Sequence, residues 1–572
     1  MSINKKDVIK LLEKIALYME LKGENTFKVS AYRRAAQSLE KDERSLAEID
    51  DFTSIKGIGQ GTNSVIVDYL ANEQSDTLIK LEKEIPKGLI PLLNVPGLGG
   101  KKLSKLYHEL EITDGESLKQ AIVDKKVEKL PGFGQKSAKN ILNALLEAGE
   151  RPERLPIAVM LPVAEEIESF LSTLPEVNRF SLAGSLRRMR ETIKDIDFII
   201  ATNQPGIVRD HLLKINDIKE VIASGKTKVS IVIEDVYDIN IDFRLVKEEE
   251  FATTLHHFTG SKDHNVKMRQ LAKSQGEKIN EYGVEIEATG ELKAFSSESE
   301  FFKHFNLNFI PPEVREDSGE VEAFVKPVHL VESQNIRGDL HMHSTWSDGG
   351  QSIEEMVLMA RKKGYEYIAI TDHSKFLRVA NGLDETRLLK QKEEIDLLNE
   401  KYSDIHIFKG VEMDILPDGS LDFNDAFLKE MDIVIGAIHS GFNQSEERIM
   451  SRLYAALDNP YVSIIAHPTG RLIGRRDGYS VDMEKLIKHA KETDTALEIN
   501  ANPNRLDLSA QWAKNAQASG VKLAINTDAH TYKMLDHMKY GVGSARKGWV
   551  QKDSVLNTWS KKELMTFLNR NK

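Results

Sequence analysis

The sequence predicts a multidomain α/β protein with a helical N-terminal region, a central α+β domain and a C-terminal β/α barrel. Three observations predict this order. Aliphatic residues recur at helical spacing over 1–150, alternating apolar segments follow over 155–245, and short apolar runs alternate with helical stretches after 336. The chain has 572 residues, which is too long for one hydrophobic core, so three to five domains are expected.

The composition is that of a globular protein whose metal sites use nitrogen and oxygen ligands. Hydrophobic residues make up 40% and charged residues 29%, and no cysteine is present, which excludes thiolate ligands. The net charge of -11 argues weakly against nucleic acid, but segments such as GGKKLSKLY and GSLRRMR are locally basic. No apolar run approaches membrane-spanning length and the N-terminus resembles an amphipathic helix, so we expect a cytoplasmic protein.

Three segments of the N-terminal region repeat an apolar residue, Gly-x-Gly and a helix. Glycines before a helix allow a tight turn and expose N–H groups that favour a phosphate oxygen. This is the pattern of the helix-hairpin-helix, which holds a DNA backbone without reading its bases. Plain helix–helix turns also use glycine, but three copies favour nucleic-acid contact. The glycines are Gly57, Gly59, Gly97, Gly99, Gly132 and Gly134.

The segment AGSLRRMRETIKDIDFII predicts a strand, a Gly184-Ser185 turn, a basic helix and a second strand. That second strand carries Asp195 and Asp197, which share one face because strand side chains alternate. Asp242 follows on the later strand YDINIDFRLV. Three converging carboxylates could hold two Mg²⁺ or Mn²⁺ ions, and the glycine turn with its basic helix could cradle a triphosphate. Strand aspartates can instead face solvent, but these features together favour nucleotidyl transfer.

The segment LHHFTGSKDHNVKMRQ places an aromatic residue beside a glycine turn. We expect a turn over Phe258–Ser261 and a helix that starts near Asn265. An aromatic ring at such a turn suits a sugar and a base at close range. Without the upstream carboxylates, an ordinary loop–helix junction would be the simpler interpretation.

The C-terminal part carries His, Asp and Glu residues at the ends of its apolar runs. Each run is expected to be a buried parallel strand, and the strand C-termini of a β/α barrel converge on one face. Imidazoles and carboxylates gathered there would form the multi-metal site of a hydrolase. A scatter of core histidines and helix caps is a poorer explanation, because nine His, Asp and Glu residues lie at strand ends. The nine predicted metal ligands are His341, His343, Asp348, His373, Glu412, His439, His467, Asp528 and His530.

Two sets of motifs resemble known families. GSLRR, DIDF, IDFRL and HFTGSKDHNVKMR, with the hairpins, resemble family X DNA polymerases, and HMHSTWSDG, TDH, GVE, IHS, AHP and TDAH resemble the PHP (polymerase and histidinol phosphatase) domain. Their order resembles that of the bacterial and archaeal two-part enzymes. The resemblance implies a helical DNA-binding domain (1–85), a helix-hairpin-helix domain (86–152), a nucleotidyltransferase palm (153–245), a nucleotide-selection thumb (246–315), a linker (316–335) and a PHP barrel (336–572).

The resemblance also implies residue roles. The three aspartates would be the catalytic ligands of Mg²⁺ or Mn²⁺, and the nine barrel residues would hold a multinuclear Mn²⁺ and/or Zn²⁺ cluster, with Asp372 as an orienting residue. Gly184, Ser185, Arg188, Phe258, Gly260 and Asn265 would contact the nucleotide. DNA contacts would come from the six hairpin glycines and from Lys28, Tyr32, Arg244 and Arg269.

The expected function is short-gap filling in DNA repair, with 3′-5′ exonuclease activity and, in some relatives, cleavage at abasic sites. The partners would be gapped or primer-template DNA and dNTPs, and the protein would be a monomer near the nucleoid. Val65 stands where lyase-active relatives carry a Schiff-base lysine, so lyase activity is expected to be weak or absent there. Two alternatives remain: a nucleotidyltransferase acting on RNA or a small molecule, and a non-catalytic DNA scaffold.

Overall fold

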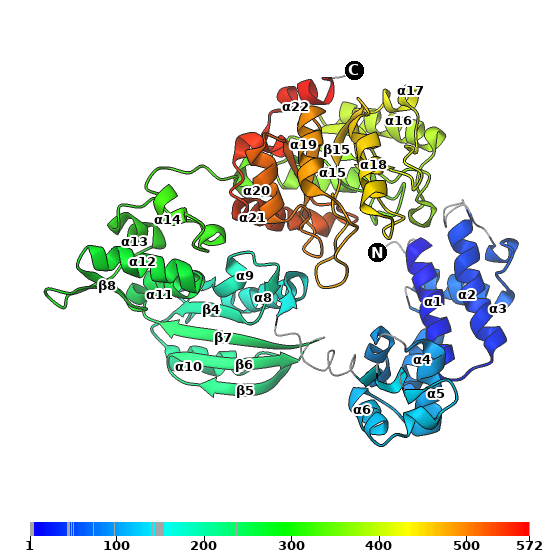
Figure 1. The fold of residues 1–572 in the computed structure, drawn as a ribbon, viewed down its shortest axis with the longest axis horizontal. Helices are drawn as coiled ribbons and strands as arrows, with labels where there is room; N and C mark the ends of the chain where they lie inside the picture. Colours follow the sequence, from blue (N-terminus) through cyan, green and yellow to red (C-terminus); the bar gives the residue numbers. More distant parts are fainter. Residues whose placement is uncertain are drawn as a thin grey trace. The chain divides into compact units, whose positions relative to one another are not determined.

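The computed structural model describes residues 5–42, 46, 49, 51–72, 74–95, 98–135, 137–139, 141–142, 154–234 and 237–570 (Figure 1). These residues form two compact units. One comprises Met1–Glu153 with the segments His343–Ile353 and Asp372–Gln391, and the other comprises the rest of the chain. In the sequence, the segments 343–353 and 372–391 follow strands of the C-terminal barrel.

The N-terminal region is helical, as predicted. Asn25 and Ser75 cap two of its helices with their side chains, and Asp114 forms a capping box with Ser117. The helices bury Leu12, Ile15 and other aliphatic residues at helical spacing. The helices are α1 (Lys5–Leu21), α2 (Thr26–Lys41), α3 (Gln60–Asn72), α4 (Asp76–Glu84), α5 (Gly100–Leu110) and α6 (Gly115–Val123).

The second glycine of each Gly-x-Gly segment starts a helix in the same way. In each one, the carbonyl of the second glycine accepts the first hydrogen bond of the following helix, and the glycines are Gly59, Gly99 and Gly134. The first glycine has a positive φ, +113° at Gly57 and +95° at Gly132, which side-chain-bearing residues disfavour. Gly97 lies outside the described residues.

The palm (154–246) is a five-stranded mixed sheet with strand order β2-β4-β7-β6-β5. Strand β7 alternates between buried and half-buried residues, and Phe198 and Phe243 stack in the core with ring centroids 5.8 Å apart. The elements are β1 (Leu155–Pro156), α8 (Ile157–Ser172), β2 (Arg179–Leu182), α9 (Gly184–Arg187), β3 (Thr192–Ile193), β4 (Ile196–Ala201), α10 (Pro205–Leu212), β5 (Ile218–Ser224), β6 (Lys228–Glu234) and β7 (Asp238–Val246).

The thumb follows and differs from the sequence prediction in three ways. It contains a small antiparallel sheet of order β10-β9-β8 that its short strands did not reveal. Phe258 and Thr259 end a helix, so only Gly260 and Ser261 form the turn. The segment 316–335, expected to be a linker, buries Phe324 in the thumb core. The elements are α11 (Phe251–Thr259), α12 (Lys262–Ser274), β8 (Glu277–Ile279), β9 (Val284–Ile286), β10 (Leu292–Lys293), α13 (Glu298–His304) and α14 (Glu320–Ala323).

The C-terminal region is a nearly closed barrel of seven parallel strands in sequence order, which confirms the predicted fold. A bridge between Met342 and Ala529 joins the first strand region to the last. Six of the seven strands are buried along their whole length, as expected when helices cover the outside. They are β11 (Gly338–Asp339), β12 (Tyr367–Ile370), β13 (His406–Asp414), β14 (Ile433–Ala437), β15 (Val462–Ile465), β16 (Ala496–Asn500) and β17 (Leu523–Asn526).

The helices of the barrel alternate with its strands and are labelled in Figure 1. They are α15 (Ile353–Lys362), α16 (Glu385–Lys401), α17 (Asp425–Leu428), α18 (Glu446–Leu457), α19 (Met483–Glu492), α20 (Ala510–Ala518), α21 (Met538–Lys547) and α22 (Lys561–Leu568). In the described residues, no helix is both long and apolar enough to cross a lipid bilayer.

Candidate active sites

The palm brings its three predicted carboxylates to one sheet face. Strands β4 and β7 pair in parallel, and their register sets Asp197 directly opposite Asp242. Asp195 lies immediately before β4 and two residues from Asp197, so it projects to the same side. The sequence predicted a common face for Asp195 and Asp197, whereas the pairing with Asp242 is fixed by strand register.

The electrostatics of this face are those of crowded carboxylates. Burial, Asp195 and Asp242 together raise the pKa of Asp197 to about 7. Asp242 pairs with Lys228 at 2.9 Å and accepts a 2.5 Å hydrogen bond from the Ser230 hydroxyl. Lys228 and Ser230 thus stabilise the negative charge of Asp242. Bound divalent cations would neutralise the same charge.

The Gly184-Ser185 turn lies directly against the carboxylates. Gly184 has a φ of +63°, and a side chain there would collide with the Asp197 carboxylate. The Ala183 N–H donates to the Asp197 carbonyl at 2.8 Å, which fixes the turn on β4. The backbone at Gly184 therefore approaches the carboxylate face more closely than a side-chain-bearing residue would allow.

The predicted nucleotide-lining residues gather at the end of α11. The Asn265 side-chain amide donates to the His257 carbonyl at 2.7 Å, which shapes the turn at Gly260. The Arg244 guanidinium lies over the Phe258 ring, 4.6 Å from its centroid. Both residues line a hollow of about 470 Å³ between palm and thumb, so two residues predicted to serve nucleotide and DNA are in contact.

A buried ion cluster joins the basic turn of the palm to the thumb. Glu298 accepts from Arg187 at 2.7 Å and 3.1 Å and from Arg315 at 2.5 Å. Arg315 is fully buried, and Arg187 follows the Gly184-Ser185 turn on α9. Burial opposes the charged carboxylate, but the two guanidinium groups outweigh it and lower the pKa of Glu298 to about 2.

Replacing Glu298 with Gln is expected to destabilise the fold strongly. Breaking a buried ion pair leaves uncompensated charge and costs about 3–5 kcal/mol. The contribution of Glu298 is present above the unfolded-state pKa and is lost as the pH falls toward 2, because the folded pKa is depressed. Calorimetry of the full chain should show a lowered transition at neutral pH and a smaller difference near pH 3. The exposed Glu291→Gln is the matched control, and an unchanged transition in Glu298→Gln would contradict the prediction.

The barrel gathers its predicted ligands at the C-terminal ends of its strands. Glu412 on β13 lies at the centre, 3.4 Å from His341, 3.2 Å from His439 and 3.0 Å from His467. Asp528 follows β17 and lies 3.6 Å from His341. The glutamate thus joins three barrel positions that are far apart in the chain.

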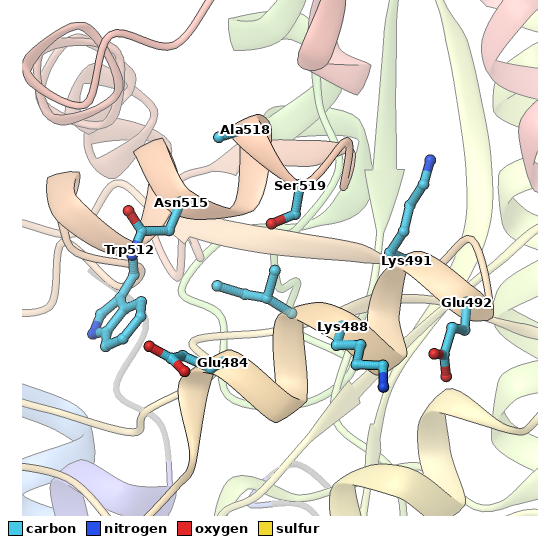
Figure 2. A pocket seen from close by; sticks show the side chains of 9 residues that line it. Glu484, Lys488, Lys491, Glu492, Trp512, Asn515, Ala518 and Ser519 are labelled. Carbon is cyan, nitrogen blue, oxygen red and sulfur yellow. The ribbon is translucent and has the colours of Figure 1, made fainter.

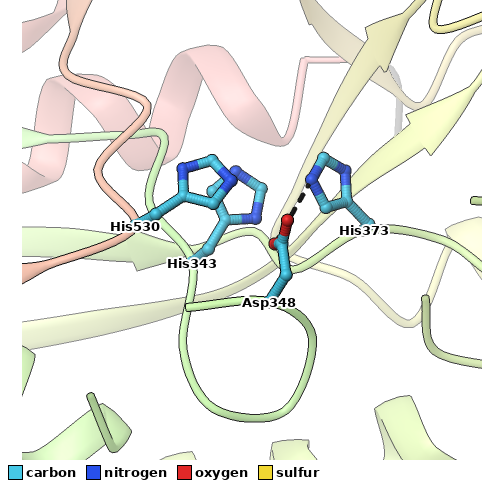
Figure 3. Close-up of side chains that lie close together, drawn as sticks. All are labelled: His343, Asp348, His373 and His530. Atoms are coloured by element: carbon cyan, nitrogen blue, oxygen red, sulfur yellow. Dashed lines mark ion pairs between the residues drawn. The ribbon is translucent and has the colours of Figure 1, made fainter. Parts of the chain in front are cut away.

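The remaining ligands come from the loops after β11 and β12 and from the end of β17. Figure 3 shows His343, Asp348, His373 and His530, with Asp348 and His373 3.6 Å apart. Donor atoms within 4.8 Å of one another form three groups among the described residues. These are His343, Asp348, His373 and His530; His341, His343 and Asp528; and His373, Glu412 and His439.

Buried carboxylates contact these predicted ligands, and the sequence pattern did not predict two of the carboxylates. Glu498 on β16 contacts His341 Nδ1 at 2.8 Å and accepts from the His467 backbone N–H at 2.8 Å. Asp414 contacts His439 Nδ1 at 3.1 Å. Two signals could have found them: Asp414 shares a strand face with Glu412, and Glu498 is an acid within an otherwise apolar run. Asp372, predicted to orient, accepts from Ser344 and holds its loop.

The Glu498→Gln substitution is expected to weaken the barrel site without unfolding it. Gln keeps the size of the side chain but removes the charge beside His341, and loss of such an outer partner costs about 10- to 100-fold in metal affinity or activity. Metal titration and hydrolysis of a labelled primer measure the change. The exposed Glu484→Gln provides the control, and an unaltered metal affinity in Glu498→Gln would rule out an orienting role.

Other residues singled out in the sequence belong to the helices of the N-terminal region. Lys28 is exposed and pairs with Glu24 at 3.3 Å, Tyr32 is half-buried, and Val65 is buried in α3.

A hollow of about 540 Å³ lies between α19 and α20 (Figure 2). Its lining belongs to the helical wall of the barrel and not to the strand ends.

The two sets of side chains define a class of protein: a palm with three neighbouring carboxylates, joined to a barrel with a histidine-rich cluster that could hold metal. Four family descriptions match in chain order: Helix-hairpin-helix domain over 3–75, SAM-like Helix-hairpin-helix tandem over 89–146, DNA polymerase beta thumb over 254–316, and PHP domain over 339–502.

Relatives match the whole chain or its barrel alone. The DNA polymerase/3′-5′ exonuclease PolX of Bacillus subtilis (strain 168) is 59% identical over 569 residues, covering 100% of both chains. A "probable phosphatase" of Thermoanaerobacter sp. (strain X514) is 33% identical over 234 residues, which are 38% of this chain and 89% of that protein. The chain belongs to the family X DNA polymerases that carry a C-terminal PHP domain.

Proposed function

We propose that this protein is a DNA-directed DNA polymerase that fills short gaps during DNA repair and trims 3′ ends with a 3′-5′ exonuclease in its barrel. The observation that carries the proposal is that both donor sets are complete in one chain. Asp197 faces Asp242 across the palm, and Glu412 contacts three histidines in the barrel. The polymerase-exonuclease relative that matches over its full length supports both halves.

In the palm, Asp195, Asp197 and Asp242 would hold Mg²⁺ or Mn²⁺, because hard cations prefer carboxylate oxygens. When bound, such ions would supply positive charge to the transferred phosphoryl group. One of the three carboxylates accepts the proton of the primer 3′-OH. Gly184, Ser185 and Arg188 hold the triphosphate, while Phe258, Gly260 and Asn265 line the sugar and base.

In the barrel, the nine His, Asp and Glu ligands would hold Mn²⁺ and/or Zn²⁺. The donor set fits these metals, since it combines imidazole nitrogens with carboxylate oxygens in a chain without cysteine. The bound cluster would supply positive charge for phosphodiester hydrolysis. Glu498 and Asp414 keep the ring orientation of His341 and His439.

The proposed partners are gapped or primer-template DNA and dNTPs, bound by a monomer at the nucleoid in the cytoplasm. The hairpin glycines present helix N-termini to DNA phosphates, with Lys28, Tyr32, Arg244 and Arg269 as further contacts.

Lyase activity is weak or absent at Val65, because a lyase needs an amine nucleophile. The five domains given above remain part of this proposal, with the segment 316–335 packed on the thumb and not a free linker.

The first experiment is a denaturing gel of a 5′-labelled primer on single-nucleotide-gapped DNA with Mn²⁺, with and without dNTPs. Lengthening with dNTPs and shortening without them is the expected result. Lengthening alone would leave the barrel with another phosphoester substrate. No change in either lane would overturn the proposal in favour of RNA-directed transfer or a scaffold.

A further inference from the structure

One carboxylate connects the palm turn to the barrel. Glu316 Oε1 lies 3.1 Å from Arg188 Nε and 2.8 Å from Lys547 Nζ. Arg188 directly follows α9 in the palm, and Lys547 ends α21 in the barrel. A residue that the proposed function assigns to the triphosphate therefore shares its counter-ion with a barrel lysine.

The shared ion pair is sheltered from solvent. The side chains of Arg188, Glu316 and Lys547 are 12%, 21% and 17% exposed. Burial raises the pKa of Glu316, but Lys547 and Arg188 outweigh it, so the net shift is downward and the carboxylate is charged at neutral pH. Electrostatic interactions at this depth are screened less than those on the surface.

The barrel is fixed to the palm and thumb around this point by independent contacts. Arg471 pairs with Glu191 at 2.7 Å, and Arg546 pairs with Glu313 at 2.9 Å. A side chain at Gly543 would collide with Met189. Lys547 also donates to the Arg188 carbonyl at 3.3 Å. Its ammonium group is thus held at Glu316 by its own contacts and by the docking of α21.

We propose that Lys547 of the barrel is a positioning residue for the incoming nucleotide, because it shares the Glu316 carboxylate with Arg188 and so weakens the hold of Glu316 on the guanidinium that a triphosphate would bind. The inference rests on the proposed role of Arg188. A bound triphosphate repels Glu316 and competes with it for Arg188. Lys547, together with Arg190 at 3.7 Å, gives the displaced carboxylate other partners, so nucleotide binding does not leave a sheltered anion uncompensated.

The experiment measures dNTP KM and kcat on single-nucleotide-gapped DNA with the full chain, together with primer shortening without dNTPs. Lys547→Met removes the charge and keeps the length of the side chain. It should raise the KM for dNTP by about 5-fold or more, the lower end of typical coupling between sites. The kcat and the shortening rate should stay within about twofold of the parent values. Lys547→Arg should restore the KM.

Three further variants separate the possible causes. Arg546→Met breaks the neighbouring pair with Glu313 without touching Glu316, so its KM should stay at the parent value. Glu316→Gln removes the competing anion and should lower the KM. The double variant Glu316→Gln/Lys547→Met should match Glu316→Gln alone, because Lys547 acts through Glu316.

Each unexpected KM result would lead to a different conclusion. A parent-like KM in Lys547→Met, when Arg188→Ala raises the KM, overturns the inference and leaves the proposed function standing. An equal rise in Arg546→Met would reduce Lys547 to a docking contact. A parent-like KM in Arg188→Ala would remove the proposed role of Arg188 and the inference with it. If Lys547→Met does not fold, a KM in Glu316→Gln that fails to fall decides against the proposal.

Discussion

The Asp197→Asn variant is expected to lose primer extension, on the order of 10³-fold, while primer shortening by the barrel continues at the parent rate. Asp197 lies opposite Asp242 and against the Gly184 turn, so its carboxylate faces both the other acids and the proposed triphosphate position. Asn keeps the shape and removes the charge that a divalent cation requires. The measurement is extension of a gapped primer with dNTPs beside shortening without them.

The raised pKa of Asp197 adds a pH dependence to this prediction. Because burial, Asp195 and Asp242 hold the pKa near 7, protons compete with the cation below that pH. Extension at low metal concentration should therefore fall as the pH drops below about 7, and more metal should move the fall to lower pH. The exposed Asp210→Asn serves as the control. Parent-like extension by Asp197→Asn, or loss of both activities, would argue against a separate palm site.

The Glu412→Gln variant is expected to show the opposite behaviour, with shortening reduced on the order of 10³-fold and extension unchanged. Glu412 contacts His341, His439 and His467, so losing its charge removes an anion that all three histidines share. Bound metal per chain should fall as well, because a neutral amide is a poorer ligand than a carboxylate.

Metal analysis after purification and the gapped-primer gel measure these two effects together. The exposed Glu430→Gln has the same chemical change on the barrel surface and should behave as the parent. Full hydrolysis with full metal content in Glu412→Gln would remove the barrel centre from the exonuclease. Taken with Asp197→Asn, the pair of variants tests whether two separable sites operate in one chain.

Local sequence pattern determined much of this protein. The period-2 alternation of YDINIDFRLV fixed which side of β7 carries Asp242, and β7 alternates accordingly. Apolar runs followed by His or Asp located the ends of the barrel strands, and the structure brings Glu412 and its histidine neighbours together there. Glycine pairs located the helix starts at Gly59 and Gly99, because glycine tolerates the turn that precedes them.

Other features were decided by contacts between distant residues. The periodicity of apolar residues does not show which strands pair. The position of Asp197 opposite Asp242 is therefore determined by the register between β4 and β7. The strands β8–β10 are too short to carry a pattern, and the polar segment 316–335 buries Phe324 because the thumb offers it a core. The roles of Glu498, beside His341, and of Glu316, between Arg188 and Lys547, depend on side chains far apart in the chain. The local sequence determined which side chains each helix and strand carries. Tertiary packing decided which distant side chains they contact, because these contacts form only when the chain has folded.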